Sequence, residues 1–311
     1  YSLTSATDNS KLIYIDSSDA TTVLSDDGSV FRYDLENAIQ SPDTEDILIS
    51  LYSCVIPYSF YNIRLNINNK LYFKRISNDN LYLFEIPAGN YTISSLGKVI
   101  QNALNNRSGD LSWASGTYSI TYDRTNMKYR YYVTGIAESE IALDFSQLPD
   151  LAPYTELGFG KSTIYSIPVG VAGTPVDAEF STNVPDVNGQ IHQLQIRTTL
   201  CSKGCYDSIT KSYSSILGSI PIDVNFGGII FQNPRDNKHK ILISTHTIKS
   251  ITLRLTDDRG RNVNLNGLSF MVAIQIDTIV KKQRHKPMDR EERRIAENHI
   301  ASLPPRKTKP V

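Results

Sequence analysis

The residues with the clearest chemical potential are two cysteines, Cys201 and Cys205, in the segment Cys-Ser-Lys-Gly-Cys. Their spacing is CxxxC, and the third cysteine, Cys54, lies far away in the sequence. A closed structural zinc site needs four nitrogen or sulfur ligands, and His192 is the only histidine nearby in the sequence. We therefore predict that Cys201 and Cys205 bind no zinc and form no disulfide, with a metal site and a disulfide as the alternatives.

Two polar segments match known binding loops only in part. The run DDRGRN (257–262) starts like a calcium loop, but its twelfth position is Leu268 instead of an acidic residue. We expect a polar turn there, with Gly260 in the left-handed conformation. The run LGFGKS (157–162) ends like a phosphate-binding loop, yet Thr155 stands where the first glycine of that loop would be.

No other motif indicates a reactive centre. The nucleophile motif GxSxG and the zinc motif HExxH are absent, and the five histidines are scattered. Carboxylate pairs such as Glu138 and Glu140 are common on surfaces and do not by themselves indicate a glycosidase. The sequence therefore nominates no catalytic, cofactor-binding or metal-binding residue, and we expect a protein that is not an enzyme and needs no cofactor.

The elements that would position any site are mostly short strands. Runs rich in Thr, Ile, Val and Tyr alternate with Asn, Asp, Gly and Ser turns, which is typical of a mainly β chain. An amphipathic helix is expected at 92–104, because its apolar residues recur at helical spacing and Thr92 can cap it. A second, polar helix is expected at 289–301. Strands are expected at 11–16, 29–35, 46–56, 63–67, 71–76, 81–86, 118–122, 128–133, 141–145, 191–200, 215–222, 224–231, 240–244, 248–256 and 268–277.

The most aromatic stretch, residues 54–73, offers a choice between a core and a binding surface. Leu65 and Ile67 alternate with polar residues before Asn68-Asn69, and Leu71 and Phe73 do so after it. An asparagine tolerates positive φ, so we predict a hairpin that turns at residues 68–69 with core-facing side chains on both strands. An aromatic ligand platform is the alternative.

Charge is distributed unevenly along a chain whose formal net charge is zero. The segment 281–311 carries 10 basic and 4 acidic residues, which makes it +6 and residues 1–280 −6. A basic tail on an acidic body indicates that the tail serves something other than its own fold. We find no apolar run of membrane-spanning length and no signal-peptide pattern at the start. Together with an odd number of cysteines, three, this favours a reducing compartment during assembly.

Five stretches taken together resemble a known protein family. They are IPYSFYNIRLNINNKLYF, IPAGNYTISSLGKVIQNAL, TYSITYDRTNMKYRYYVT, LGFGKS and ITLRLTDDRGRNVNLNGLSFMVAIQI. Their order and wording resemble the penton, or vertex minor capsid, proteins of virophages and polinton-like eukaryotic double-stranded DNA viruses, over about residues 30–280. The pattern LTD..G....LNG..F is the more specific, whereas P.GNY.I..L...I also occurs in the major capsid proteins of the same viruses.

The fold class implied by the resemblance is mainly β: a single jelly-roll β-sandwich with an inserted α+β domain and a basic C-terminal arm. The expected domains are an N-terminal arm at 1–28, a discontinuous jelly roll at 29–60 and 186–280, an inserted outer domain with its connector at 61–185, and the C-terminal arm at 281–311. The Pro- and Gly-containing run 166–190 supports a connector between the two domains.

The function implied by the resemblance is structural, with five copies forming the pentameric vertex, or penton, of an icosahedral DNA virus. The expected partners are the other copies in the homopentamer, neighbouring major capsid protein subunits and, through the inserted domain, a host receptor. The basic tail is expected to contact another subunit, with nucleic acid as the less favoured partner, and no membrane span is expected. The protein would be assembled inside the host cell and reside in the virion.

Three alternatives remain at this point. One is a short, trimeric major capsid protein of the same lineage, and another is a β-sandwich hydrolase. The third is a carbohydrate- or receptor-binding β-sandwich, which would expose clustered tyrosines on the inserted domain, such as Tyr129, Tyr131 and Tyr132. Strand alternation would instead bury some of these tyrosines against the helix.

Overall fold

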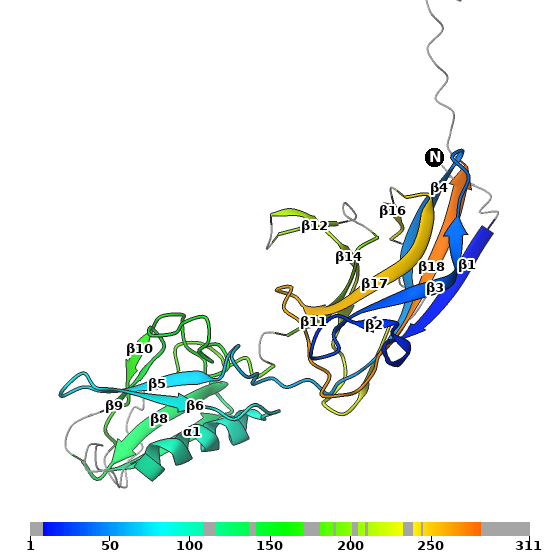
Figure 1. Ribbon diagram of the computed structural model, residues 1–311. Helices are drawn as coiled ribbons and strands as arrows, with labels where there is room; N and C mark the ends of the chain where they lie inside the picture. The colour runs from blue at the N-terminus through cyan, green and yellow to red at the C-terminus, as the bar shows by residue number, and fades with distance from the viewer. Residues whose placement is uncertain are drawn as a thin grey trace, which may run out of the picture.

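The fold consists of two lobes, each with a hydrophobic core of its own (Figure 1). The computed structural model describes residues 9–107, 116–136, 141–170, 181–188, 191–200, 205–208, 211–232, 239–243 and 245–280. Strands dominate these residues, and α1 (Ile93–Arg107) is the α-helix among them. The mainly β class predicted from the sequence is confirmed.

The larger lobe is a sandwich of two antiparallel sheets. The first sheet has the order β1 (Asn9–Asp16), β18 (Met271–Val280), β4 (Glu45–Pro57) and β15 (Ile229–Gln232), with β16 (Ile241–Ile243) also paired to β4. The second sheet has the order β14 (Ile216–Pro221), β11 (Gln193–Thr198), β17 (Thr247–Asp257), β3 (Val30–Gln40) and β2 (Thr22–Val23). Successive strands of the chain therefore pass repeatedly from one sheet to the other.

Alternation along the strands builds the core between these two sheets. In β17, Leu253 and Leu255 are fully buried, while Arg254 between them is exposed. Burying a Leu side chain contributes roughly 1.5 to 3 kcal/mol relative to leaving it in water. The period-2 pattern of the sequence therefore decides which face of each strand turns inward.

Part of the expected N-terminal arm belongs to the sandwich. Residues 9–16 form β1, which pairs with β18 along its whole length, and residues 22–23 form β2 beside β3. Ile15 is fully buried in the core. The arm expected at 1–28 is therefore wrong from residue 9 onward, because strand pairing and an apolar anchor together offset the entropy lost on ordering this segment.

The smaller lobe combines a sheet, a hairpin and a helix. Its sheet has the order β10 (Ile164–Ser166), β9 (Ile141–Asp144), β5 (Lys70–Arg75) and β6 (Leu81–Glu85), and its hairpin pairs β7 (Thr117–Asp123) with β8 (Lys128–Thr134). All residues of the larger lobe's core lie before residue 61 or after residue 190, whereas the smaller lobe's core lies between residues 63 and 169. The smaller lobe is thus an insertion into the chain of the larger one.

The predicted amphipathic helix is confirmed as α1. Leu96, Ile100 and Leu104 are fully buried on the side of the helix that packs against β7. Thr92 caps the helix, since its Oγ1 accepts a hydrogen bond from the Ser95 N–H at 3.2 Å. The polar helix expected at 289–301 lies outside the described residues, as does the whole basic segment 281–311.

The hairpin predicted at Asn68-Asn69 is wrong. Residues 65–67 form a turn instead of a strand, and Asn66 adopts a positive φ of 55°. Asn68 and Asn69 are buried, and their side chains hydrogen-bond to backbone groups of neighbouring loops. Buried amide groups need such partners, so the two asparagines stabilise a loop that leads into β5, whose strand partners are β6 and β9.

Three short elements complete the described structure. The 3-10 turn η1 (Ser17–Asp19) follows β1, and a small hairpin of β12 (Cys205–Asp207) and β13 (Ser212–Ser214) lies between β11 and β14 in the chain. None of the helices among the described residues combines the length and the apolar character that crossing a bilayer requires.

Candidate functional site

The cysteines do not form a site that the structure describes. Cys201 and the side chain of Cys205 lie outside the described residues, so the prediction that they bind no zinc and form no disulfide stays a prediction. Cys54 is buried without a disulfide, and burial raises the pKa of its thiol to about 12. Such a thiol is a poor nucleophile at neutral pH. Among the described residues, no group of three or more His, Cys, Asp or Glu side chains could hold a metal ion.

The segment 157–162 is a structural turn. Gly158 has a φ of +79°, and a Cβ atom there would lie 2.5 Å from the carbonyl oxygen of Asn183, so only glycine fits. Lys161 forms an exposed ion pair with Asp150 at 2.6 Å. The next element along the chain is β10, so the turn lacks the helix N-terminus that a phosphate-binding loop provides.

The DDRGRN turn is held together by its first carboxylate. Asp257 is fully buried, and its Oδ1 accepts hydrogen bonds from the backbone N–H groups of Arg259 and Arg261. Its Oδ2 lies 2.8 Å from Nε of Arg261. Gly260 has a φ of +78°, which confirms the left-handed conformation expected there. Asp257, the acid that begins the calcium-like run, is therefore the carboxylate that pairs with the neighbouring arginine.

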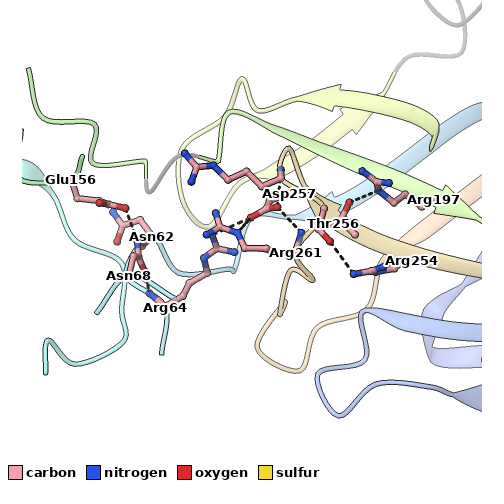
Figure 2. Close-up of polar contacts among 11 residues, drawn as sticks. Asn62, Arg64, Asn68, Glu156, Arg197, Arg254, Thr256, Asp257 and Arg261 are labelled. Atoms are coloured by element: carbon pink, nitrogen blue, oxygen red, sulfur yellow. Dashed lines mark hydrogen bonds and ion pairs between the residues drawn. The ribbon is translucent and has the colours of Figure 1, made fainter. Parts of the chain in front are cut away.

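A second arginine reaches the same carboxylate from the other lobe. Nη2 of Arg64, a residue just before β5, lies 3.2 Å from Oδ2 of Asp257, and the two side chains are only 9% and 0% exposed. Burial is the main cause that lowers the pKa of Arg64. Figure 2 shows Arg64 reaching across to Asp257 and Arg261. A buried charge without its partner costs several kcal/mol, so this pair resists separation of the lobes.

Glu156 lies on the inserted side of this contact. Its side chain is 1% exposed, its Oε1 accepts a hydrogen bond from Nδ2 of Asn68 at 2.6 Å, and its Oε2 has no hydrogen-bond partner. Burial raises the pKa of Glu156 to about 7; the charge of Asp186 adds to this, while Asn68 and Arg64 oppose it. The site therefore contains a carboxyl group that changes its charge near neutral pH.

We name this contact region the lobe seam, defined as Asn62, Arg64, Asn68, Glu156, Asp257 and Arg261 (Figure 2). Asn62 joins it to the connector, because its Nδ2 donates to the carbonyl oxygens of Tyr91 and Val187 at 2.7 Å each. The cavity beside Glu156 measures about 30 Å³. That volume suits a water molecule or two. The ion pair of Arg64 with Asp257 makes the lobe seam a joint between the lobes.

The tyrosines that the carbohydrate-binding alternative would need are not exposed. Tyr129 and Tyr131 are fully buried in the core of the smaller lobe, and Tyr132 is half-buried. The Tyr129 hydroxyl donates a hydrogen bond to the carbonyl oxygen of Ile93 in α1. The hypothesis of an aromatic platform on β8 is therefore wrong, because alternation along the strand turns two of its three tyrosines inward.

The larger lobe exposes apolar side chains on the outer side of its first sheet. Tyr14, Ile229, Phe231 and Met271 are 62%, 61%, 57% and 42% exposed. Val55 lies between Phe231 and Met271 in the cross-strand register, Ile229 lies two residues from Phe231, and Tyr14 lies two residues from Asp16, the partner of Met271. These side chains therefore lie on neighbouring positions of one side of the sheet. We name this surface the apolar face and define it as Tyr14, Val55, Ile229, Phe231 and Met271. Exposed apolar patches of this kind mark interaction surfaces in soluble proteins.

The sequence analysis predicted neither the lobe seam nor the apolar face. Arg64 and Glu156 are single charges inside largely apolar runs, Tyr-Asn-Ile-Arg-Leu and Tyr-Thr-Glu-Leu-Gly-Phe. Buried charges are rare unless they are paired, and an isolated charge in an apolar run was the signal that could have indicated them. The apolar face carried no local signal, because its members come from four separate strands.

Comparison with known proteins gives matches among solved structures alone. No family model matches the chain, and none of the curated proteins matches it. A solved structure of the mavirus penton protein, labelled with selenomethionine, is similar to it with a TM-score of 0.48 and 11% sequence identity. The match covers 87% of this chain and 100% of the penton chain.

Proposed function

We propose that this protein is a non-enzymatic structural component of a virus capsid, with a single jelly roll as its building block. Five copies would form the vertex of an icosahedral DNA virus. The observation that carries this proposal is the order of the strands in the sandwich.

The support for a jelly roll comes from the way the chain moves between the two sheets. Apart from the short strands β16 and β2, one sheet contains β1, β18, β4 and β15, and the other contains β3, β17, β11 and β14 in that neighbouring order. Eight antiparallel strands in two sheets, wound so that the first and last strands of the chain are neighbours, are the pattern of jelly rolls, which build viral capsids and some lectin domains. The insertion between β4 and β11 leaves this pattern intact.

The lobe seam supports a mechanical role for the inserted lobe. A projecting domain contributes to a shell only if its orientation is fixed, and a buried ion pair requires good geometry to be favourable. Arg64 and Asp257 form a buried pair through one contact, and the hydrogen bonds of Asn62 hold the connector beside it. We therefore propose that the inserted lobe projects as a rigid unit from the capsid surface, where a host receptor is its candidate partner.

The apolar face supports assembly with other subunits. Interfaces bury apolar and aromatic side chains at their centre, and such side chains lie exposed on the isolated subunit. The partners that cover the apolar face would be copies of this chain or neighbouring major capsid subunits. The resemblance of the sequence to penton proteins favours five copies, whereas a short major capsid protein would be trimeric.

The mass of the assembled protein tests this proposal. Native mass spectrometry of the purified 34.8 kDa chain should find particles of five chains, and electron microscopy should show five-fold symmetry. Particles of three chains would favour the major capsid alternative. A chain that stays monomeric at high concentration and does not join shells of co-expressed major capsid protein would overturn the capsid function.

A further inference from the structure

The β12–β13 hairpin carries two exposed tyrosines that form a preassembled pair. Tyr206 and Tyr213 stand directly opposite each other in the strand register. They are 66% and 65% exposed, and their rings lie 5.9 Å apart at an angle of 87°. The Tyr206 hydroxyl donates a hydrogen bond to the carbonyl oxygen of Lys211 at 3.0 Å, which fixes one of the two rings. We name this pair the tyrosine knob.

The opposite side of the hairpin is anchored to the sandwich. Asp207 and Ser214 are 8% and 6% exposed. Arg197 of β11 binds both, with Nη1 donating to Oγ of Ser214 at 2.8 Å and Nη2 lying 3.4 Å from Oδ2 of Asp207. Neighbouring residues of a strand point to opposite sides. The anchor therefore holds the tyrosine knob facing away from the sandwich, and this preorganisation of the two strands lowers the ordering cost of binding.

The anchor also shows on which side of the sandwich the knob lies. Leu194 and Ile196 of β11 point into the core, whereas Gln195 lies on the outer side of the second sheet. Arg197 joins this outer side, since Nη2 donates to Oε1 of Gln195 at 2.7 Å and Nε donates to Oγ1 of Thr256 at 3.2 Å. The apolar face lies on the outer side of the first sheet. Knob and face therefore lie on opposite sides of one subunit.

We propose that the tyrosine knob of one subunit docks on the apolar face of a second copy of this chain. This inference rests on the proposed function, because it requires that the chain assembles with itself. A knob and a face on opposite sides of a subunit cannot contact each other within that subunit. Between copies they make a head-to-tail contact, which repeats around a ring and closes when the rotation per subunit divides the circle.

The geometry of the knob favours a protein partner over a sugar. Two rings at 87° present one face and one edge, instead of the flat platform on which a sugar ring stacks. Aromatic anchors placed in an apolar surface are the side chains that contribute most to protein interfaces. On the receiving side, Phe231, Ile229 and Met271 supply apolar surface that is open to water in the isolated subunit.

Two complementary variants test the contact. The knob variant carries Tyr206→Ser and Tyr213→Ser, and the face variant carries Ile229→Ser and Phe231→Ser. All four side chains are more than half exposed, so both variants should fold, which circular dichroism and a melting curve check. Loss of a central aromatic anchor costs 2 kcal/mol or more, so each variant should assemble at least about 30-fold more weakly than the wild type. The replacement Tyr213→Phe keeps both rings and the Tyr206 hydrogen bond and should assemble normally, as should Met127→Ser, which alters a 55% exposed residue of the smaller lobe.

Mixing the two variants distinguishes a head-to-tail contact from other arrangements. The knob variant retains an intact face and the face variant retains an intact knob, so the mixture should form dimers of one copy of each and no rings. Normal assembly of the knob variant alone would overturn the inference and leave the capsid function standing. A knob variant that stays monomeric but forms no dimer with the face variant would show that the knob binds another surface. A wild-type chain that forms no oligomer would overturn both proposals.

Discussion

The replacement Glu156→Gln should remove a large part of the pH dependence of the smaller lobe's stability. The carboxyl group titrates at about 7 in the folded protein against a reference pKa of 4.5. Each pKa unit corresponds to about 1.4 kcal/mol, so the folded state loses about 3 kcal/mol relative to the unfolded state between these two pKa values. Because the folded pKa is the higher one, this stabilising contribution is present below pH 4.5, falls as the pH rises towards 7, and stays lost above it.

Glutamine keeps the shape of the side chain and the acceptor for Asn68 but cannot ionise. We therefore expect the variant to be more stable than the wild type at pH 8 by about 3 kcal/mol, and close to it at pH 4.5. The charged groups that face Glu156 are Arg64, Asp186, Arg259 and Arg261. The wild type and the variant share these groups, so the difference between the two proteins isolates Glu156.

Urea unfolding at a series of pH values measures this difference. Hydrogen exchange of the α1 amides follows the smaller lobe. The control is Glu85→Gln, since the Glu85 side chain is 54% exposed on β6 of the same lobe, and it should follow the wild type at every pH. Parallel stability curves for the wild type and Glu156→Gln would refute the reasoning, because they would show that Glu156 titrates alike in the folded and unfolded chain.

Three further predictions concern the seam, the cysteines and the tail. The replacement Asp257→Ala leaves Arg64 buried without its partner and should destabilise the protein by about 3 to 5 kcal/mol in urea unfolding. The control Asp34→Ala breaks an exposed pair with Arg32 and should cost less than about 1 kcal/mol. Equal effects of the two replacements would count against the buried pair. Metal analysis should find no stoichiometric zinc, and intact mass under non-reducing conditions should show Cys201 and Cys205 unbridged. A chain ending at Val280 should fold with little loss of stability but be left out of assembled particles, and its normal incorporation would contradict a role for the tail in docking.

The buried pair of Arg64 and Asp257 joins the inserted lobe to the sandwich, and this has a consequence for assembly. The carboxyl group of Glu156 lies on the inserted side of this pair. The same buried carboxyl that makes the smaller lobe sensitive to pH is therefore close to the joint that sets its orientation. If the inserted lobe projects from a capsid, loss of the seam should disturb its orientation before the sandwich itself unfolds.

The sequence by itself determined the local elements of this fold. Period-2 runs predicted most of the strands, and helical spacing predicted α1 together with its buried face of Leu96, Ile100 and Leu104. These predictions succeed because a strand or a helix with one buried face repeats its apolar residues with the period of its backbone. Gly260 could be placed in the left-handed conformation for a similarly local reason, since a polar turn between two strands requires it there.

Only the tertiary structure decided which residues of distant segments come into contact. Arg64 and Asp257 are 193 positions apart, and no local pattern in the sequence pairs an arginine with one aspartate among many. Asn68 and Asn69 carry a turn signal, but tertiary hydrogen bonds use their side chains inside a loop. The anchor of Arg197 beneath the tyrosine knob and the four strands that share the apolar face are likewise contacts between distant segments. Propensity and periodicity describe a residue's relation to its chain neighbours, whereas the joint and both surfaces depend on which distant segments the sandwich brings together.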